Sequence, residues 1–429
     1  MMIMRNVTRA LLAVTVAVAG LSACTGPKET DPSAATDQLE VMTWWTSASE
    51  AKAFKVFTDA YARANAGVTL TNASVQGGAG SSARVALAKR LIAGDPPDVW
   101  QTFAGAATTA YEKSAQIRDV SSVFGAGGLA AQVNPTILQS VTIDGKQYAV
   151  PTGAHRSNVL FFNKAVLDKA GVAAPAAGYT PAAFRADLEK VKASGVPALC
   201  LGAKDRFTTA ELLDNILLAR LGPDGWAKIQ DDKLDWNGTE VKDALGELDD
   251  LLAYTSADAD TQTWDQAIGQ LVEGSCGFLT MNDSAFGELT ARGGSDAVGE
   301  VVYPGTDGAF LAVTDVFVAS RTAPNAKNAL AFLSVLADPA ANLEFSKLKG
   351  SVPVLKNVDA TGLSPYQQEA AKALWAGPVL PSLSHGQAMN PGLTQGYFDA
   401  IAAYVRTRQP QSFAQAIAEA VAVYQPAGH

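Results

Sequence analysis

I-D-G-K-Q-Y-A-V-P-T-G-A-H-R-S-N-V-L-F-F-N-K, residues Ile143–Lys164, predicts two extended segments around a break. Asp144-Gly145 is typical of a hairpin turn, and the alternating residues Gln147–Val150 favour a short strand. Pro151 cannot donate to a β-ladder, so we expect this strand to end there or to lie at a sheet edge. The apolar run V-L-F-F within Ser157–Phe162 suits a second strand that is buried on both faces.

A polar cluster lies between these two segments. Its members are Gly153, His155, Arg156, Ser157 and Asn158. Such a cluster is expected where the chain crosses from one domain to another beside a cleft. Taken alone, it also fits a surface loop within one domain.

The residues before this stretch alternate between strands and helices. We expect strands at 39–44, 68–75 and 99–103, with one helix starting near Ser49 and another covering 85–92. This βαβ order indicates a parallel sheet, and ligands of such sheets bind outside the carboxyl ends of the strands. The side chains at those ends are Trp44, Trp45 and Gln101.

The residues after the stretch are mainly helical. Expected helices cover 180–195, 209–221, 241–253, 267–272, 325–337, 339–348 and 412–424, and another begins at Ser364-Pro365. Expected strands cover 198–201, 277–281, 300–303 and 310–319, the last interrupted at Thr314-Asp315. With 48% hydrophobic residues, the chain has enough apolar side chains for two domains.

The N-terminus predicts export. Residues 1–23 are read as a signal peptide, because Arg5 and Arg9 precede an apolar segment shorter than the roughly 20 residues that span a bilayer. The sequence L-S-A-C, ending at Cys24, resembles the bacterial lipobox, in which the Cys carries the lipid. An ordinary signal peptide with an unrelated Cys is the alternative. Residues 24–38 predict a flexible tether, so we expect an extracytoplasmic chain held to the cell membrane by its lipid alone.

Charge and motifs exclude several classes of ligand. The formal net charge is −9, and removal of the signal peptide with its two Arg makes it −11, which does not attract nucleic acid. The Gly-rich turn at 76–80 matches no nucleotide-binding motif, so we expect no cofactor. No metal site is expected, because His155, His385 and His429 lack ligand spacing.

Two cysteines remain once Cys24 is assigned to the lipid. Cys200 and Cys276 each border a short apolar segment. In an oxidising compartment such a pair favours a structural disulfide. Two buried free thiols are the alternative.

Several short motifs follow one another along the chain. They are E-V-M-T-W-W at 40–45, the G-G-A-G turn, G-D-P-P-D-V-W-Q at 94–101, Y-A-V-P with H-R-S-N-V-L-F-F-N-K, L-G-P-D-G-W at 221–226, T-W-D-Q-A-I at 263–268, T-D-V-F at 314–317, L-K-G-S at 348–351 and S-L-S-H-G at 382–386. In this order, behind a lipobox, they resemble the family 1 solute-binding lipoproteins of bacterial ABC importers. Within that family the chain is most similar to the glucose/galactose-type monosaccharide-binding proteins.

The resemblance implies a two-lobed α/β periplasmic-binding-protein fold with a central ligand cleft and discontinuous lobes. One lobe is expected to comprise 39–152 and 314–352, and the other 153–313 and 353–429. The crossovers then fall at 143–158, at 314–315 and near Ser351. A monomer is expected, whose lobes close around a carbohydrate and which passes it to the membrane permease subunits of the importer.

The family's ligand contacts fall here on residue types that suit a sugar. Hydroxyl edges call for carboxylates, amides, Lys or His, and the C–H faces call for aromatic rings. The implied contacts are Trp44, Trp45, Glu50, Gln101, His155, Trp264, Asp283, Asp315, Lys349 and His385.

Each implied contact has a plainer reading. Trp44 and Trp264 could pack in a core, and of the adjacent pair Trp44-Trp45 we expect one ring to pack and one to stack on sugar. Lys349 could be a surface residue at a helix C-terminus, and His385 a loop residue without a role. His155 could instead be a hinge residue that orients its neighbours.

Two positions depart from the glucose-binder pattern. Phe103 stands where that pattern has a His, and Ser284 stands where it has a Trp. Loss of one polar edge contact and one aromatic face opens part of the expected pocket. The ligand could therefore be larger than a hexose, or a hexose with an aglycone.

Two other functions compete with this binding protein, which is not expected to be an enzyme. A glycoside hydrolase would need two carboxylates flanking one bond, for which Asp283 and Asp315 are candidates. Nothing in the sequence separates their pKa values. A lipid-anchored interaction module would expose large apolar patches, whereas the apolar residues here recur with helix and strand periods.

Overall fold

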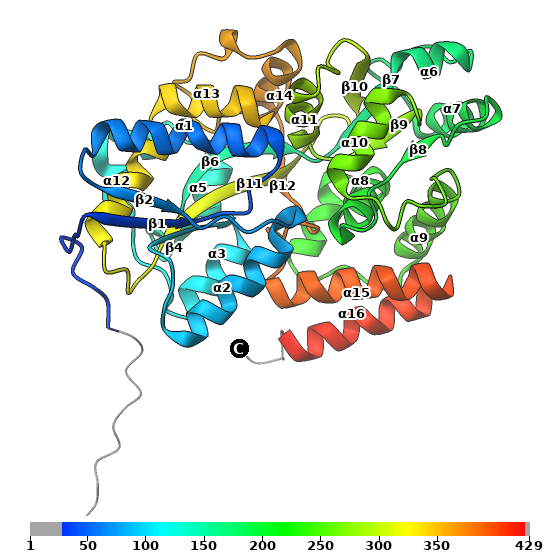
Figure 1. Cartoon of the computed structure of the whole chain (residues 1–429). Coiled ribbons are helices and arrows are strands. Elements are labelled where there is room, and N and C mark those ends of the chain that lie inside the picture. The colour runs from blue at the N-terminus through cyan, green and yellow to red at the C-terminus, as the bar shows by residue number, and fades with distance from the viewer. Residues whose placement is uncertain (1–27, 425–429) are drawn as a thin grey trace, which may run out of the picture.

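The computed structural model describes residues 28–424, which form two α/β lobes side by side (Figure 1). The expected two-lobed fold is confirmed. The signal peptide and Cys24 lie outside the described residues. Among the residues that are described, no helix is both long and apolar enough to cross a membrane.

The first lobe is built on a six-stranded sheet. Five strands follow the order β12-β11-β3-β1-β2, and the sixth strand, β6, also pairs with β11. The strands are β1 (Gln38–Met42), β2 (Thr69–Asn72), β3 (Val99–Phe103), β6 (Val150–Arg156), β11 (Phe310–Ala319) and β12 (Val379–Pro381). The helices are α1 (Ala48–Ala64), α2 (Ser81–Ala93), α3 (Ala106–Lys113), α4 (Ser121–Gly125), α5 (Pro135–Ser140), α12 (Ala326–Leu336), α13 (Pro339–Lys349) and α14 (Pro365–Ala376). Because β1 is parallel to both β2 and β3, the expected βαβ arrangement is confirmed.

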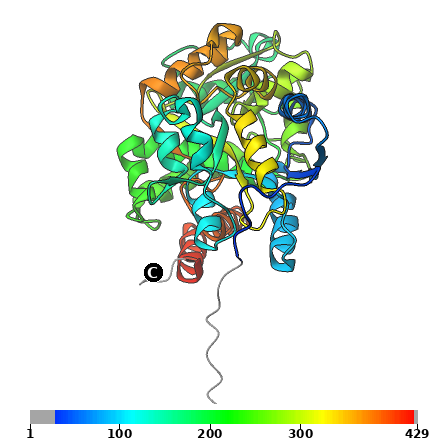
Figure 2. The ribbon, with the colours of Figure 1, turned by 90° about the vertical axis from the view of Figure 1, so that its left-hand side faces the viewer.

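The second lobe has a four-stranded sheet with the order β10-β7-β9-β8. The strands are β7 (Val159–Asn163), β8 (Leu199–Cys200), β9 (Phe278–Thr280) and β10 (Val298–Val302). The helices are α6 (Lys164–Lys169), α7 (Pro181–Ala193), α8 (Arg206–Gln230), α9 (Thr239–Leu252), α10 (Trp264–Glu273), α11 (Ser284–Ala291), α15 (Pro391–Thr407) and α16 (Pro410–Tyr424). In both views the C-terminal pair α15–α16 lies at the same end of the molecule as α2 (Figure 2).

The stretch that predicts the domain crossing forms a hairpin and two strands. β4 (Thr142–Ile143) pairs with β5 (Lys146–Gln147) across Asp144 and Gly145, whose φ angles of 49° and 77° suit this turn. Of the two alternatives for Pro151, the sheet edge is confirmed, because β6 continues through it to Arg156 and, among the described residues, β11 is the one named strand with which β6 pairs. A register shift between Asp315 and Val316 accommodates the proline. The polar cluster therefore belongs largely to strand β6. The chain passes from the first lobe to the second just after this cluster, between β6 and β7.

The second predicted crossing, at 314–315, is wrong, because β11 runs without interruption from Phe310 to Ala319 in the sheet of the first lobe. The third crossing comes later than predicted. Val354, Leu355, Ala370 and Leu374 are buried in the core of the first lobe, although the sequence analysis assigns 353–429 to the second. The apolar face of α14 covers the first core, so the chain changes lobe only around β12, after which Leu383 lies in the second core.

The described part of the predicted tether lies against the first lobe. The Arg118 guanidinium donates to the Thr30 carbonyl at 2.5 Å, and Lys327 N–H donates to the Ala34 carbonyl. Thr36 Oγ1 donates to Asn325 Oδ1 at 2.5 Å. The expectation of a flexible tether is therefore wrong for residues 30–36, where the carbonyls of Thr30, Ala34 and Thr36 accept hydrogen bonds from the lobe.

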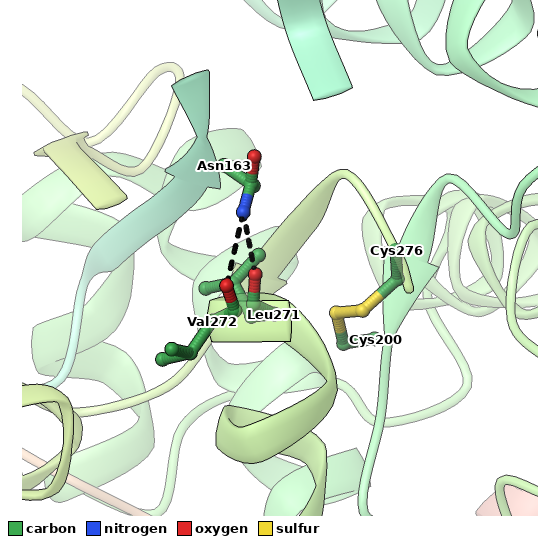
Figure 3. Close-up of a disulfide and its surroundings, with 5 residues drawn as sticks. All are labelled: Asn163, Cys200, Leu271, Val272 and Cys276. Atoms are coloured by element: carbon green, nitrogen blue, oxygen red, sulfur yellow. Dashed lines mark hydrogen bonds between the residues drawn. A yellow bond between two sulfur atoms is a disulfide. The ribbon is translucent and has the colours of Figure 1, made fainter. Parts of the chain in front are cut away.

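Cys200 and Cys276 form a disulfide in the second lobe (Figure 3). Their Cα atoms are 5.6 Å apart, and the bond joins β8 to the segment before β9. It closes a loop over a sequence separation of 76 residues.

We expect the double variant Cys200→Ala/Cys276→Ala to lose about 2–4 kcal/mol of unfolding free energy, because the disulfide restricts the unfolded chain. Urea unfolding of the variant and of the oxidised and reduced wild-type protein measures this. An unchanged unfolding midpoint of the wild-type protein in reductant would contradict the prediction.

Candidate binding site between the lobes

A cavity of about 330 Å³ lies between the two lobes. The first lobe supplies residues after β1, the last residue of β3, the start of α1 and the end of α13, and the second supplies the starts of α8, α10 and α11. The predicted contacts that line it are Trp44, Trp45, Glu50, His155, Trp264, Asp315, Lys349 and His385. Phe103 and Ser284, the two departures, line it as well.

Gln101 and Asp283 are buried behind the cavity lining instead. Gln101 Nε2 donates to Asp315 Oδ1 at 2.8 Å. Asp283 Oδ1 lies 2.6 Å from His155 Nδ1, while its Oδ2 accepts from Arg156 N–H at 3.1 Å. Both residues therefore orient side chains that do line the cavity.

Lys349 and Glu50 form a buried ion pair at one wall of the cavity. Lys349 Nζ lies 3.2 Å from Glu50 Oε1, and the Lys349 side chain is 3% exposed. Nζ also lies 5.7 Å from the centroid of the Trp45 ring. Burial raises the pKa of Glu50, although the Lys349 charge opposes this effect. The reading of Lys349 as a surface residue is wrong.

His155 lies between two carboxylates. Its Nδ1 contacts Asp283 at 2.6 Å, and its Nε2 lies 3.5 Å from Asp315 Oδ2 without a hydrogen bond to any described residue. Burial and the Lys349 charge favour the neutral ring, but the contacts with the Asp283 and Asp315 carboxylates outweigh them and raise the pKa of His155. His155 and Lys349 in turn lower the pKa of Asp315 despite its burial. The wall therefore presents charged donors and acceptors to one small volume.

The aromatic residues divide between core and cavity. Trp45 packs among Phe54, Phe317 and Phe345, with ring centroids 5.1–6.0 Å away. Trp44 instead contacts Phe103 at 5.1 Å. The Trp44 ring is thus the better placed of the two to meet a ligand, and Phe103 makes the wall beside it apolar.

Sequence reasoning missed part of the second-lobe wall. Asp205, Phe207 and Asn282 line the cavity but match no motif that we single out. Phe207 contacts the His385 ring at 5.4 Å, and Trp264 N–H donates to Asp205 at 2.9 Å. Asp205 and Phe207 lie at the start of α8, and the start of a helix was the one sequence signal that could have indicated them. A short stretch of sequence does not show that this helix end faces the first lobe.

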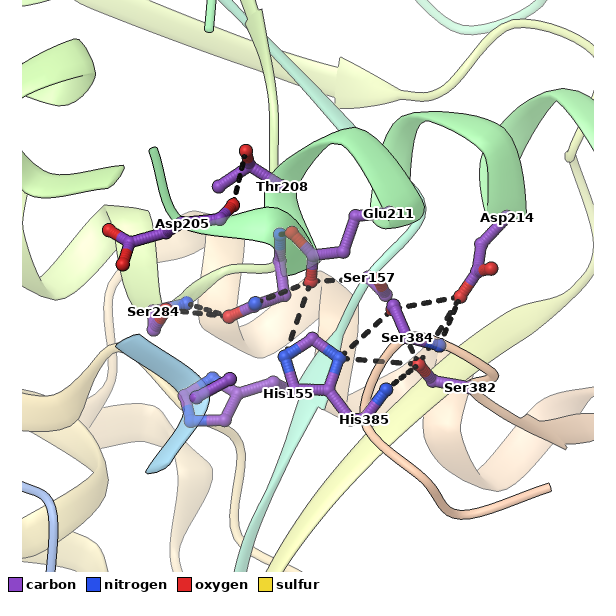
Figure 4. Close-up of polar contacts among 12 residues, drawn as sticks. His155, Ser157, Asp205, Thr208, Glu211, Asp214, Ser284, Ser382, Ser384 and His385 are labelled. Carbon is purple, nitrogen blue, oxygen red and sulfur yellow. Dashed lines mark hydrogen bonds and ion pairs between the residues drawn. The ribbon is translucent and has the colours of Figure 1, made fainter. Parts of the chain in front are cut away.

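A second polar group lies behind this wall, centred on α8 (Figure 4). Glu211 is fully buried, and its Oε1 accepts from Asn282 Nδ2 at 2.6 Å and from Ser157 Oγ at 3.2 Å. Asn282 Oδ1 in turn accepts from Ser284 Oγ at 2.6 Å. Burial raises the pKa of Glu211 to about 8. Ser284, which stands where the glucose-binder pattern has a Trp, is thus linked through Asn282 to the Glu211 carboxyl group, which the folded protein keeps protonated at neutral pH.

This proton predicts how stability depends on pH. Between about pH 5 and 8, folded Glu211 retains a proton that the unfolded chain has lost, so its contribution to the unfolding free energy falls as the pH rises, by at most about 1.4 kcal/mol per pH unit. We expect Glu211→Gln, which cannot ionise, to lose stability less steeply over this range. Urea unfolding at several pH values measures the slope. Exposed Glu369→Gln is the control, and equal slopes for all three proteins would contradict the prediction.

Comparison with known proteins identifies the family. A sequence model described as "Bacterial extracellular solute-binding protein" matches residues 45–343, which is more than half of the chain. The chain belongs to this family. The family consists of solute-binding proteins rather than enzymes, and it acts outside the cytoplasm.

Curated relatives of this solute-binding protein cover most of its length. It is 28% identical over 375 residues to an uncharacterized ABC transporter extracellular-binding protein of Pyrococcus horikoshii, covering 86% of this chain and 85% of the relative. It is 29% identical over 378 residues to a probable sugar-binding periplasmic protein of Rhizobium meliloti, covering 86% and 89%.

Solved structures share its fold. The bacterial solute receptor AcbH, described as preferring β-D-galactopyranose, superposes with a TM-score of 0.79 at 18% identity, covering 89% of this chain and 97% of AcbH. A chitin oligosaccharide binding protein gives 0.78 at 18% identity, with the same coverage.

The lobes of this solute-binding protein touch on both sides of the cavity. On one side, Glu288 of α11 accepts from Ser49 N–H at 3.0 Å and Ser49 Oγ–H at 2.5 Å. On the other, Gly78 meets the start of α8 so closely that a Cβ atom there would lie 2.8 Å from Asp205 Cγ and Phe207 Cε1. The turn thus requires glycine at 78 for this closed arrangement.

Proposed function

We propose that this protein is the carbohydrate-binding subunit of an ABC importer and delivers a glucose- or galactose-like monosaccharide, or a small glycoside, to a membrane permease. The observation that carries the proposal is the cavity between the lobes, where the Lys349–Glu50 and His155–Asp315 pairs lie beside the Trp44 and Trp264 rings. Charged donors and acceptors suit sugar hydroxyls, and the rings suit its C–H faces. Relatives named as sugar-binding and ABC transporter proteins support the same function. Anchoring through Cys24 and a monomeric state belong to this proposal.

A larger glycoside is the second candidate ligand. A further cavity of about 520 Å³ lies beside the first and shares Gly78, Asp205 and Phe207 with its lining. Tyr111 and Phe398 add aromatic surface there. A ligand that extends past Gly78 could place a second sugar or an aglycone in this space.

A glycoside hydrolase is less well supported. Asp283 does not line the cavity, and its carboxylate is taken by His155, Arg156 N–H and the Tyr366 hydroxyl at 3.0 Å. It is therefore poorly placed to flank a bound glycosidic bond opposite Asp315. Sustained product release from aryl glycosides would nevertheless overturn the binding proposal.

A thermal-shift screen of the unlipidated mature chain tests the proposal. The panel contains D-glucose, D-galactose, disaccharides and aryl glycosides. A ligand at about 100 times its dissociation constant stabilises by roughly 2.7 kcal/mol, which shifts the melting temperature measurably. A shift with a hexose supports the monosaccharide, whereas a shift only with larger glycosides supports the extended ligand. The absence of any shift across saturating sugars would contradict a carbohydrate ligand.

We expect Trp264→Ala to abolish the shift caused by the sugar that the screen identifies, because its ring lines the cavity and is 9% exposed. Trp375→Ala is the matched control, since that ring is 39% exposed on α14 and lines no part of this cavity. Isothermal titration calorimetry compares their affinities. Equal affinities of the two variants would contradict a role for Trp264 in binding.

A further inference from the structure

His385 has one ring nitrogen turned toward a buried serine pair. It lies in the loop after β12, lines the cavity and is 5% exposed. Its Nδ1 lies 3.1 Å from Ser384 Oγ and 3.3 Å from Ser382 Oγ (Figure 4). Burial lowers the pKa of His385 to about 3, so the ring is neutral and carries a single proton. The nitrogen that holds this proton decides whether His385 can donate or accept toward the cavity.

Asp214 determines what Ser384 can offer to this ring. Asp214 lies on α8, has no exposed surface and is not part of the cavity lining. Its Oδ2 accepts from Ser384 N–H at 3.0 Å and from Ser384 Oγ–H at 2.8 Å, and its Oδ1 accepts from the Tyr397 hydroxyl at 3.0 Å. A carboxylate only accepts, so the single hydroxyl hydrogen of Ser384 is committed to Asp214. Only lone pairs of Ser384 remain for Nδ1, and they attract it only if Nδ1 carries the proton.

Two neighbours favour the opposite tautomer, but their contacts are weaker. Ser382 Oγ–H could donate to Nδ1 at 3.3 Å, yet the same hydroxyl lies 3.0 Å from Ser384 Oγ. Glu211 Oε1 would attract an Nε2 proton, but it lies 3.7 Å away, beyond hydrogen-bond range. Glu211 Oε1 also already accepts from Asn282 at 2.6 Å, and burial suppresses its charge. The distances therefore favour the proton on Nδ1.

We propose that Asp214, acting through Ser384, fixes His385 in the Nδ1–H tautomer, so that its Nε2 offers a bare acceptor to a hydroxyl donor of the ligand. The ligand part of this statement rests on the proposed function. His155 is held differently, because its Nδ1–H donates to the Asp283 carboxylate and Asp315 Oδ2 lies 3.5 Å from its Nε2, so that a carboxylate attracts a proton to each ring nitrogen. The cavity thus combines an accepting and a donating imidazole, which suits hydroxyl groups that do both. Asp214 and Ser384 are positioning residues that determine which hydroxyl hydrogens are recognised.

Nitrogen NMR of the ¹⁵N-histidine-labelled, unlipidated chain tests the tautomer without any sugar. The His385 signals are assigned by their loss in His385→Asn. We expect the wild-type spectrum to show a protonated Nδ1 and a bare Nε2. Ser384→Ala should move the proton to Nε2, whereas Ser384→Thr, which keeps the hydroxyl, and Ser382→Ala should retain the wild-type pattern. A protonated Nε2 in the wild-type protein, or an unchanged pattern in folded Ser384→Ala, would overturn the proposal.

Fluorinated sugars test what the tautomer does. Fluorine accepts but cannot donate, so monodeoxyfluoro derivatives of D-glucose and D-galactose report which hydroxyl must donate. For the parent sugar that binds, we expect one fluorinated position to weaken wild-type binding at least about tenfold, a loss of about 1.4 kcal/mol. In Ser384→Ala the ratio of the affinities for the parent sugar and for this fluorinated derivative should be severalfold smaller. Equal tolerance of fluorine at every position would overturn the ligand part of the proposal. If neither parent binds, the hexose proposal fails, while the NMR result still decides the tautomer.

Discussion

Lys349→Met is expected to abolish sugar binding and to lower the unfolding free energy by about 3 kcal/mol. The ammonium group lies 3.2 Å from Glu50 Oε1 in a buried pair. Its removal leaves an uncompensated carboxylate in the interior, which typically costs 3–5 kcal/mol, and also removes a donor from the cavity. Urea unfolding and calorimetric titration with the identified sugar measure the two losses separately.

The double variant Lys349→Met/Glu50→Gln separates stability from binding. We expect it to regain most of the lost stability, because no unpaired charge remains, but not the affinity for sugar. Lys347→Met is the matched control, since it removes a lysine of the same helix whose partner Glu344 is exposed. If the double variant binds sugar normally, Lys349 contributes only to structure.

Asp315→Asn is expected to weaken sugar binding by roughly 10- to 100-fold, the value of one or two charge-assisted hydrogen bonds. Asp315 lies 3.5 Å from His155 Nε2 and accepts from Gln101 at 2.8 Å. Because His155 and Lys349 lower the pKa of Asp315, its stabilising contribution is present above the unfolded pKa and is lost as the pH falls through the folded value. The variant should therefore be less stable than the wild-type protein at neutral pH, and the difference should narrow in acid.

The same substitution should lower the pKa of His155, since it removes one of the carboxylates that favour the imidazolium ion. Titration of the His155 signals by NMR measures this shift. Asp307→Asn, at an exposed position in the turn before β11, is the control and should change neither the affinity nor this pKa. A His155 pKa that is unchanged in Asp315→Asn would contradict the electrostatic coupling.

Local patterns predicted much of the secondary structure but not its pairing. The period of the apolar residues predicted α1, α2, α12 and α13 and the strands β1, β3, β7 and β9, but not the short helices α3, α4 and α5. The continuation of β6 through Pro151 depends on β11, which lies more than a hundred residues later in the chain. The position of α14 depends likewise on which core its apolar face covers. Such non-local contacts leave no signal in a short window of sequence.

The candidate site was only partly predictable, because residue type can be read from the sequence whereas side-chain direction depends on non-local contacts. Trp44 was indicated by its position at a strand end, and the family resemblance implied Asp315 and Lys349; all three line the cavity. The same reasoning could not tell that Gln101 and Asp283 lie behind the lining, because that depends on which way each side chain points. Nor could it find Phe207, which reaches the cavity only when the two lobes are apposed.

By itself, the sequence determined that the chain is an α/β protein of two lobes in the solute-binding family, because hydrophobic periodicity and ordered motifs are local properties. Only the tertiary structure decided how buried polar groups share their protons. Asp214 lies on α8, 170 residues before Ser384, and the 2.8 Å hydrogen bond between them exists only after α8 packs against the loop that follows β12. Hydrogen bonding is a short-range interaction, so the donors and acceptors that the cavity presents are set by that packing.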